Sequence, residues 1–273
     1  MIISDYHVHT EFSGDSSTPT SLMIEQAVKL GLHRLCLTEH HDIGFLDMVT
    51  DQIDIDFQLD TDRYISTITK LKEIYYSDIQ LLTGVELGMA PELAGSLTTY
   101  TKQYDFDYII GSTHLVDNMD PYYPAYFERY PGKRGMERYF EVTLNNILNF
   151  SEYDSLGHLD YAVRYCPDPT SYRPSDYLDY IDAILKHLIH NGKALEVNTS
   201  ALKKGFANPN PHRDILVRYK ELGGEQLTIG SDAHTTDAIG YGFQLIAELL
   251  QDIGFRYYTV YEKRTPEFLS IKS

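Results

Sequence analysis

The sequence predicts an α/β fold in which parallel strands and crossover helices form a barrel. Short runs of β-forming residues alternate with longer helical patterns along the whole chain, which is typical of strands joined by crossover helices. Apolar residues make up 42% of the 273 residues and charged residues 23%, a composition typical of globular proteins. Barrels of this length commonly form one domain, so we expect residues 1–273 to be a single domain.

Eight short segments are predicted as strands and seven longer segments as helices, so we expect a distorted or incomplete barrel. No repeat with a period of about 20 to 50 residues interrupts this alternation. The predicted strands cover residues 2–7, 34–38, 79–85, 108–112, 153–157, 194–198, 227–230 and 256–260. The predicted helices cover residues 20–30, 61–76, 91–104, 135–150, 174–191, 211–222 and 237–251.

The first helix has the clearest signals. It is predicted to begin near Thr20, directly after Pro19, and to stop at Gly31. Proline is common at helix starts and glycine just past helix ends. Its apolar residues recur at helical spacing, so we expect one face to pack inward. This face is predicted to hold Leu22, Ile24, Ala27, Val28 and Leu30.

The charge balance is strongly acidic. There are 40 Asp and Glu residues against 23 Lys and Arg residues, for a formal net charge of -17. Such a field repels polyanions, so we expect no nucleic-acid partner. Bound cations can reverse the field inside one pocket, so a small phosphorylated substrate stays compatible with this charge.

Cysteine content and hydropathy bear on the cellular compartment. Cys36 and Cys166 are the only cysteines, and both lie among apolar or aromatic neighbours, which favours free thiols over a disulfide framework. The first residues lack the pattern of a secretory signal, and no stretch approaches about 18 uninterrupted apolar residues. We therefore expect a cytoplasmic protein with no membrane segment.

Histidine and carboxylate residues follow six of the predicted strands. In a parallel barrel the carboxyl ends of all strands meet at one face, where functional side chains gather. We therefore expect these residues to converge on one site. The strand ends carry Asp5, His7 and His9; Glu39, His40, His41 and Asp42; Glu86; His114; His158 and Asp160; and Asp232 and His234.

The spacing within these groups indicates a metal site. His7 and His9 are two residues apart, so both rings project from the same side of an extended segment. Asp232 and His234 repeat this spacing. A single pair of this kind is a weak signal, but two pairs with four further strand ends are a strong one. Histidine and carboxylate ligands without thiolates favour Zn, Mn or Fe over Mg or Ca.

The remaining histidines are placed differently. His33 precedes a strand, and His187 and His190 lie in the last turns of a helix, where a cation suits the helix dipole. We expect these three to be structural. His212 lies in a proline-containing loop, and the sequence assigns it no role.

Four blocks of sequence resemble the polymerase and histidinol phosphatase (PHP) family, and most of all its stand-alone histidinol-phosphate phosphatases. The resemblance extends from Asp5 to about Gly242. It implies a distorted (β/α)7-type barrel with a metal site at the carboxyl ends of the strands. The blocks are Asp5-Tyr6-His7-Val8-His9-Thr10, Thr38-Glu39-His40, Gly111-Ser112-Thr113-His114 and Gly230-Ser231-Asp232-Ala233-His234.

The resemblance also implies two to three divalent transition-metal ions, and so a trinuclear centre when all sites are filled. A carboxylate stands at Asp15 where some relatives have histidine, and Asp15 could instead cap a loop. The implied ligands are His7, His9, Glu86 and Asp232 for the first ion, Glu86, His114 and His158 for the second, and Asp15, His40 and His234 for the third.

The expected reaction is hydrolysis of a phosphomonoester. Paired metal ions can activate a shared water and clamp the attacking and leaving oxygens. We therefore expect a hydroxide bridging the ions at Glu86 to attack phosphorus, with Glu86, Asp232 and Arg164 as catalytic residues. Arg164 is the first candidate for a forked contact to phosphate, and an ordinary surface ion pair is its alternative.

Three acidic residues beside the expected ligands are candidates for substrate binding. Glu39, Asp42 and Asp160 could receive a cationic amine of the substrate or orient the imidazole ligands. The segment 115–134 is rich in tyrosine and is equally compatible with a packed surface loop and a lid facing the substrate.

The family resemblance implies that the substrate is histidinol phosphate, with a role in histidine biosynthesis. Three alternatives remain open. The chain could act on another phosphomonoester, a phosphodiester or a nucleotide. It could be an amidohydrolase, although no lysine ends a central strand as such enzymes often require. It could also be a metal-binding or proofreading-like module without activity of its own.

Overall fold

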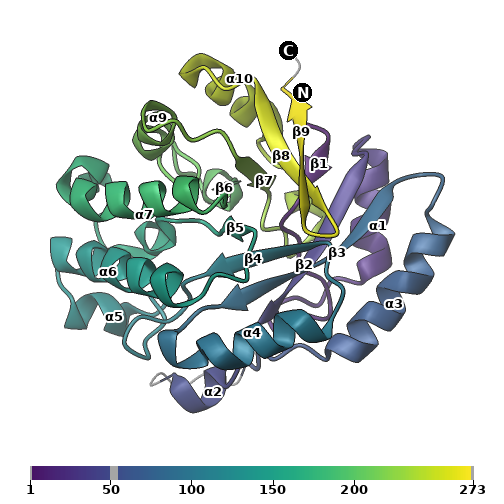
Figure 1. Cartoon of the computed structure of the whole chain (residues 1–273), viewed down its shortest axis with the longest axis horizontal. Coiled ribbons are helices and arrows are strands. Elements are labelled where there is room, and N and C mark those ends of the chain that lie inside the picture. The colour runs from purple at the N-terminus through teal and green to yellow at the C-terminus, as the bar shows by residue number, and fades with distance from the viewer. Residues whose placement is uncertain (1, 50–54, 272–273) are drawn as a thin grey trace.

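The computed structural model describes residues 2–49 and 55–271 and contains a seven-stranded parallel sheet (Figure 1). The strands follow one another around the sheet in chain order, each paired in parallel with the next. They are β1 (Ser4–Asp5), β2 (Arg34–His41), β3 (Gln80–Gly88), β4 (Tyr108–Ser112), β5 (Ser155–Leu156), β6 (Ala194–Asn198) and β7 (Leu227–Gly230).

The sheet closes on itself through contacts between its first and last strands. The amide of Tyr6 donates to the carbonyl of Ile229 at 3.0 Å, and that of His9 donates to Ala233 at 2.9 Å. Val8 and Ala233 form a parallel bridge in the same seam. The predicted α/β barrel of the (β/α)7 type is confirmed.

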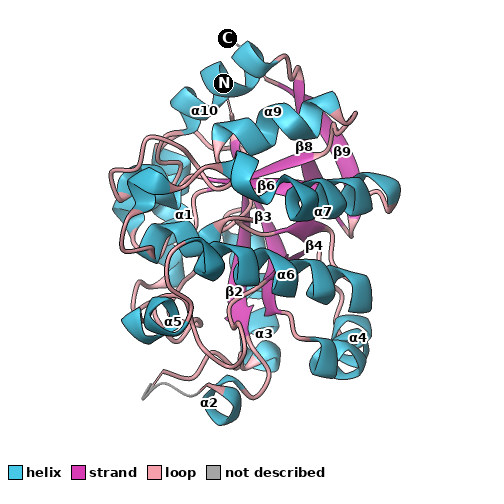
Figure 2. Cartoon of the chain, turned by 90° about the vertical axis from the view of Figure 1, so that its left-hand side faces the viewer, coloured by secondary structure: helices cyan, strands magenta, loops and turns pink. Residues whose placement is uncertain are grey.

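The longer helices lie outside the barrel (Figures 1 and 2). Among the described residues, no helix has both the length and the apolar character needed to cross a bilayer. The long helices are α1 (Thr20–Lys29), α3 (Thr61–Ile74), α4 (Ala94–Gln103), α6 (Lys133–Asn149), α7 (Leu178–His190), α9 (Arg213–Glu221) and α10 (Phe243–Ile253).

Three short helices lie in loops that follow the carboxyl ends of strands, and the sequence did not predict them. They are α2 (Phe45–Met48), α5 (Pro124–Arg129) and α8 (Ser200–Lys203). Figure 2 shows α2 and α5 at the end of the molecule away from the two termini. Short 3₁₀ turns also occur, at Pro91–Leu93, Tyr161–Tyr165, Pro169–Ser171, Pro174–Tyr177 and Thr236–Ala238.

The inward face predicted for α1 is partly wrong. Met23, Ile24 and Ala27 are fully buried, whereas Leu22 is 47% exposed and Leu30 50% exposed. Leu22 lies on nearly the opposite side of the helix from Ala27, and Leu30 lies past its last turn. The apolar pattern here was broader than the face that packs.

The eighth predicted strand is not part of the barrel. Residues 256–260 fall largely in β8 (Tyr257–Glu262), which forms an antiparallel hairpin with β9 (Thr265–Ser270), a strand that was not predicted. The hairpin covers the end of the barrel where strands begin. The backbone amide of Lys263 donates to Asp107, just before β4, and Arg264 pairs with Asp154, just before β5. The hydroxyl of Tyr6 donates to the carbonyl of Tyr261 at 2.8 Å.

The ion pair between Arg264 and Asp154 yields a prediction about stability. The Arg264 Nε lies 2.9 Å from a carboxylate that is only 7% exposed. Burial raises the pKa of Asp154 and Arg264 opposes that rise. We expect Arg264→Ala to reduce the free energy of unfolding by roughly 2–3 kcal/mol at neutral pH, because it leaves a buried charge without its partner.

The way in which this loss of stability depends on pH follows from the direction of the pKa shift of Asp154. Burial favours the neutral carboxyl group, which does not need Arg264 as a partner. The reduction in the free energy of unfolding caused by Arg264→Ala should therefore shrink as pH falls through the pKa of Asp154. Urea unfolding of wild type and variant at about pH 7 and about pH 4 measures it. Lys263→Ala, in the same turn and also at positive φ, is the control. An equal loss at both pH values would contradict the assignment.

Candidate metal centre

The carboxylate of Glu86 lies at the centre of the predicted site. It projects from β3, is fully buried, and accepts a hydrogen bond from the Ser112 hydroxyl at 2.6 Å. Five imidazole rings surround it. The distances from a ring nitrogen to the nearer Glu86 oxygen are 3.1 Å for His7, 3.5 Å for His9, 3.0 Å for His40, 3.2 Å for His114 and 2.9 Å for His158.

The strands place these side chains as the barrel argument requires. His40 and Glu86 lie inside β2 and β3, which extend beyond their predicted ends, and they are paired in register. His7 and His9 follow β1, and His114 and His158 follow β4 and β5. Ligands from separate parts of the chain thus converge at the carboxyl ends of the strands.

Several buried polar atoms in this cluster approach one another closely but without hydrogen-bond geometry, and so make no hydrogen bond among the described residues. They are Nε2 of His7, Nε2 of His9, Nδ1 of His40, Nε2 of His234 and Oε2 of Glu86. Burying a polar atom without a partner is costly, and such groups in proteins normally bind another group, water or an ion. Imidazole nitrogens and a carboxylate are donors that suit transition-metal ions, so the residues fit a metal.

Other side chains fix the opposite edges of three rings. Nδ1 of His7 lies 2.5 Å from Glu196, and Nδ1 of His114 lies 2.7 Å from Asp42. Nδ1 of His9 contacts the Ser13 hydroxyl, which donates to Glu39 at 2.6 Å. A carboxylate behind a ring favours the tautomer that leaves Nε2 free for a metal.

A third cluster borders the first two. Oδ2 of Asp15 lies 3.0 Å from Nε2 of His234 and 3.7 Å from Nε2 of His40. Asp15 caps none of the described helices. Donor atoms of four groups lie within 4.8 Å of one another: His7, His9 and Asp232; Glu86, His114 and His158; His9, His40 and His234; and His40, Asp42 and His114. The predicted ligands are therefore brought together, and their binding of ions stays a prediction.

The electrostatics of the cluster favour cations. Burial raises the pKa of Glu86, but the facing rings of His7, His114 and His40 lower it well below its usual range on balance. Burial likewise opposes ionisation of Asp232, and the neighbouring His7 and Arg164 lower its pKa. Both carboxylates are therefore charged, Glu86 at a fully buried position and Asp232 on the wall of the cavity above the cluster.

The loop that carries Asp232 and His234 is held in a strained shape. Asp232 has φ of +54°, a conformation that non-glycine residues seldom adopt. Its amide donates to the carbonyl of His7 at 2.7 Å. The buried carboxylate of Asp5 accepts from the amide and hydroxyl of Ser231 and from the amide of Gly240. Asp5 therefore fixes the loop rather than facing the cluster.

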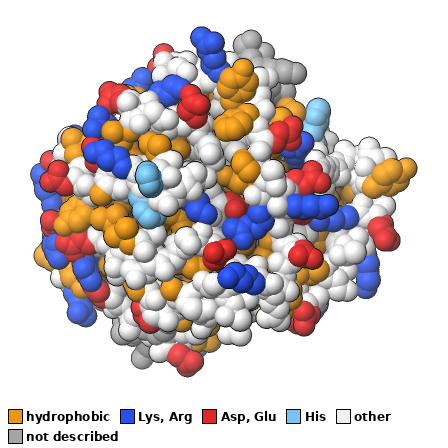
Figure 3. Space-filling model, viewed as in Figure 1, with side chains coloured by type: hydrophobic (Ala, Val, Ile, Leu, Met, Phe, Trp, Pro, Cys, Tyr) orange, Lys and Arg blue, Asp and Glu red, His pale blue; other side chains and the backbone are white. Residues whose placement is uncertain are grey.

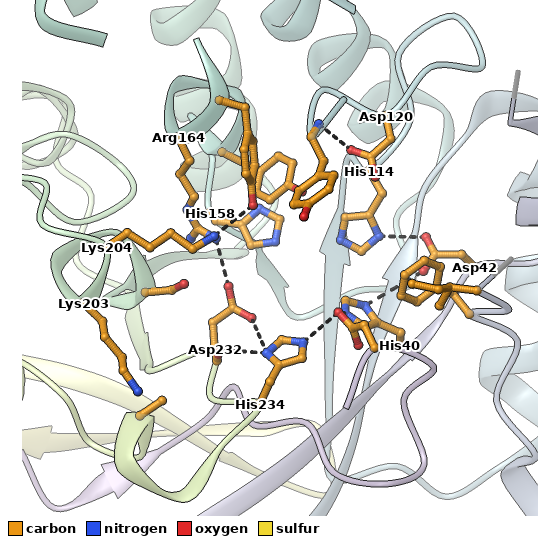
Figure 4. Close-up of a pocket in the computed structure, with 18 of the residues that line it drawn as sticks. His40, Asp42, His114, Asp120, His158, Arg164, Lys203, Lys204, Asp232 and His234 are labelled. Carbon is orange, nitrogen blue, oxygen red and sulfur yellow. Dashed lines mark hydrogen bonds and ion pairs between the residues drawn. The ribbon is translucent and has the colours of Figure 1, made fainter. Parts of the chain in front are cut away.

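A cavity of about 590 Å³ opens above the cluster. Figure 4 shows Arg164, Lys203 and Lys204 together on one side of it and His114 and Asp42 on the other. Arg164 is almost fully buried, and its Nη1 lies 3.0 Å from Asp232. This excludes the alternative of an ordinary surface ion pair. The volume is typical of small-molecule sites.

Two of the predicted substrate-binding residues lie away from this cavity. Glu39 is fully buried, and its oxygens accept from Thr10 and Ser13. Asp160 is fully buried and accepts from Asn210, the amide of His212 and Tyr172. Both carboxylates face protein groups, so the geometry favours an orienting role over substrate contact. Asp42 lines the cavity and also holds His114.

The remaining histidines lie away from the cavity, and the tyrosine-rich segment borders it. His212 caps α9, where its ring accepts from the amide of Asp214. His33, His187 and His190 do not line the cavity. In the segment 115–134, Tyr126 is buried, whereas Tyr122 and Tyr123 line the cavity; a role of the segment as a lid stays a prediction.

Comparison with known proteins decides the family. The model of the PHP domain matches residues 5–200. The chain belongs to the PHP family. Among PHP proteins, it is 32% identical to a probable histidinol-phosphatase of Clostridium acetobutylicum, over 98% of this chain and all of that protein. It is 30% identical to the histidinol-phosphatase of Lactococcus lactis, over 92% of this chain and 91% of that protein.

Two solved structures match the fold of this chain. The crystal structure of histidinol phosphate phosphatase from Lactococcus lactis, complexed with zinc, L-histidinol and phosphate, matches with a TM-score of 0.87 and 26% identity. The match covers 97% of this chain and 98% of that one. A putative histidinol phosphatase from Listeria monocytogenes shares the fold at a TM-score of 0.74 and 19% identity, over 89% of this chain and 99% of that one.

Several residues that shape the PHP site were not predicted from the sequence. Glu196 and Asn198 lie two residues apart on β6, the strand of the seven-stranded sheet for which no ligand was predicted. Their period-2 spacing was the same signal as in the His7 and His9 pair. Lys203, Lys204 and Asp120, which line the cavity, carry no motif.

The close packing of Gly88 against Asp42 yields a second prediction. A Cβ at Gly88 would coincide with the Asp42 carboxylate. We expect Gly88→Ala to push Asp42 away from His114 and to weaken zinc binding about 10- to 100-fold, as is usual when a ligand loses its supporting carboxylate.

Zinc affinity by competition with a chromogenic chelator measures this effect. Gly95→Ala is the matched control, because a Cβ at Gly95 meets no atom within 4 Å. Equal zinc affinity in the two variants would show that the contact between Asp42 and His114 does not support a metal ligand.

Proposed function

We propose that the chain is a metal-dependent histidinol-phosphate phosphatase that hydrolyses L-histidinol phosphate to L-histidinol and phosphate in histidine biosynthesis. The observation that carries the proposal is the buried Glu86 carboxylate with five imidazoles around it, beside a buried arginine in a cavity of small-molecule size. Full-length relatives named histidinol-phosphatase support the choice of substrate.

The proposed cofactors are two to three divalent transition-metal ions, namely Zn, Mn or Fe. Zinc in the related Lactococcus lactis structure supports this choice. When bound, such ions stabilise charge on phosphoryl oxygens and lower the pKa of coordinated water. The proposed ligands are His7, His9, Glu86 and Asp232; Glu86, His114 and His158; and Asp15, His40 and His234.

The protein side chains orient the substrate and its phosphate. Arg164 donates to a phosphoryl oxygen, and Lys204 adds positive charge on the same side of the cavity, where Lys203 is paired with Asp237 at 2.7 Å. This local cationic side admits a phosphate despite the net charge of -17. On the face seen in Figure 3, positive and negative side chains are interspersed.

The rest of the substrate carries a protonated amine and an imidazole ring. Asp120 and Asp42 line the cavity and provide negative charge for the amine. Tyr122, Tyr123 and Tyr165 line it as well and offer aromatic surfaces to the ring. A phosphate, an amine and a ring therefore each find a matching group in the same cavity.

The proposal extends to the whole chain and to its compartment. Asp232 and His234 lie beyond the matched residues 5–200, as does β7, so residues 1–273 are proposed to act as one domain. A cytoplasmic location is proposed, and the two free thiols support it.

Turnover of defined substrates tests the function. We expect zinc-loaded protein to hydrolyse histidinol phosphate with a kcat/KM at least about tenfold above that for p-nitrophenyl phosphate or a nucleoside monophosphate, a difference of about 1.4 kcal/mol in transition-state binding. A similar kcat/KM for all three would indicate a general phosphatase and contradict the choice of substrate.

Substitution at the central carboxylate tests the site. Glu86→Gln should lower kcat on the order of a thousandfold, because metal ions contribute several kcal/mol to such transition states. Metal analysis by mass spectrometry should find two to three ions per chain in wild type and fewer in the variant. Glu92→Gln, at an exposed position, should change neither. Full activity of Glu86→Gln would refute the assignment.

A further inference from the structure

Arg164 is held by side chains on all three nitrogens of its guanidinium group. Nε donates to Oδ1 of Asn210 at 2.6 Å, Nη2 donates to Oδ1 of Asn198 at 2.7 Å, and Nη1 donates to Asp232 at 3.0 Å. The guanidinium also lies over the Tyr161 ring, 5.2 Å from its centroid. A guanidinium has five N–H groups, so these contacts leave one N–H on each Nη for another acceptor.

The two asparagines are fixed to each other through their backbones. Asn198 ends β6, and Asn210 lies in the loop before α9. The amide of Asn198 donates to the carbonyl of Asn210 at 2.7 Å, and the reverse bond measures 2.9 Å. Both residues are almost fully buried. The two asparagines are therefore held in fixed positions next to Arg164.

Carboxylates behind the asparagines determine which way the amides face. Nδ2 of Asn210 donates to Oδ1 of Asp160 at 2.6 Å, and Nδ2 of Asn198 donates to Glu196 at 3.3 Å. Because each NH₂ group is directed at a carboxylate, each amide oxygen faces Arg164. The second oxygen of Asp160 accepts from the amide of His212, which fixes Asp160 in turn.

The chemistry of these partners distinguishes the arrangement from a buried salt bridge. Amide oxygens are neutral, so they direct Nε and Nη2 without cancelling the charge of the guanidinium. Asp232 is the one carboxylate that the structure pairs with Arg164 within the described residues, and it also faces His7 and His9. Positive charge thus remains for an anion in the cavity.

We propose that Asn198 and Asn210, with Asp160 behind Asn210, are positioning residues that fix Arg164 for a phosphoryl oxygen of the substrate. They act through Arg164 and do not contact the substrate. This inference rests on the proposed phosphatase function and assigns its phosphate-binding geometry to three residues outside the metal cluster.

A double-mutant cycle on phosphate binding tests the proposal. The probe is inorganic phosphate, titrated by calorimetry into the zinc-loaded full chain. Arg164→Met should weaken binding about 10- to 100-fold, since it removes charge-assisted hydrogen bonds. Asn210→Ala should weaken binding about tenfold in the wild-type background and less than about twofold in the Arg164→Met background.

The coupling between the two substitutions decides between a positioning role and a merely structural one. Equal effects of Asn210→Ala in both backgrounds would overturn the proposal, as would unchanged phosphate binding in Arg164→Met. Asn208→Ala, in the same loop, is the matched control and should bind phosphate like wild type. Asn198→Ala is the second variant and should show the same coupling to Arg164.

Zinc content and thermal unfolding are measured for every variant. If the two asparagines act only through Arg164, both asparagine variants should keep their zinc and their fold. Loss of zinc in both variants, or loss of the fold in both, would contradict this role. The phosphate titration needs no histidinol. Poor turnover of histidinol phosphate with intact coupling would therefore refute the proposed substrate and leave the positioning role standing.

Discussion

The structure depends most on one buried negative charge, the carboxylate of Glu86. A carboxylate without access to water is stable only if positive charge or hydrogen-bond donors compensate it. Five imidazole rings and one hydroxyl approach it, yet one of its oxygens and several ring nitrogens remain without hydrogen bonds. The barrel brings imidazole rings from the ends of β1, β2, β4 and β5 to this point, because only the carboxyl ends of parallel strands converge in this way.

A second set of carboxylates determines how the rings face Glu86. Glu196, Asp42 and Glu39 lie on the far side of His7, His114 and His9, with Ser13 between Glu39 and its ring. Asp160 serves Arg164 in the same way through Asn210. Strand β6 contributes only to this outer set, through Glu196 and Asn198. The strand that offered no ligand in the sequence therefore supports ligands from its neighbours.

The sequence predicted the convergence of the ligands because strand ends and period-2 spacing are local signals. His7, His9, Asp232 and His234 could be recognised from residues two positions apart. The partners of Arg164 could not be recognised in this way, because Asn198 and Asn210 approach it only after β5 and β6 have paired and a loop has folded back.

The segment 256–260 was misplaced for a related reason. Its alternation suits a barrel strand and a hairpin strand equally, and only the closed seam between β1 and β7 excludes it from the barrel. The exposure of Leu22 likewise depends on which helical face meets the barrel.

The C-terminal hairpin has a consequence for the order of folding. Its turn pairs with residues before β4 and β5, and the barrel seam needs β7, so the last fifth of the chain contributes to both ends of the barrel. During synthesis from the N-terminus, the early strands can pair with one another while the sheet still has two open edges. Such edges invite pairing with other chains until they are covered. Those edges meet only through β7 and the residues after it, and the same seam brings Asp232 and His234 beside His7 and His9.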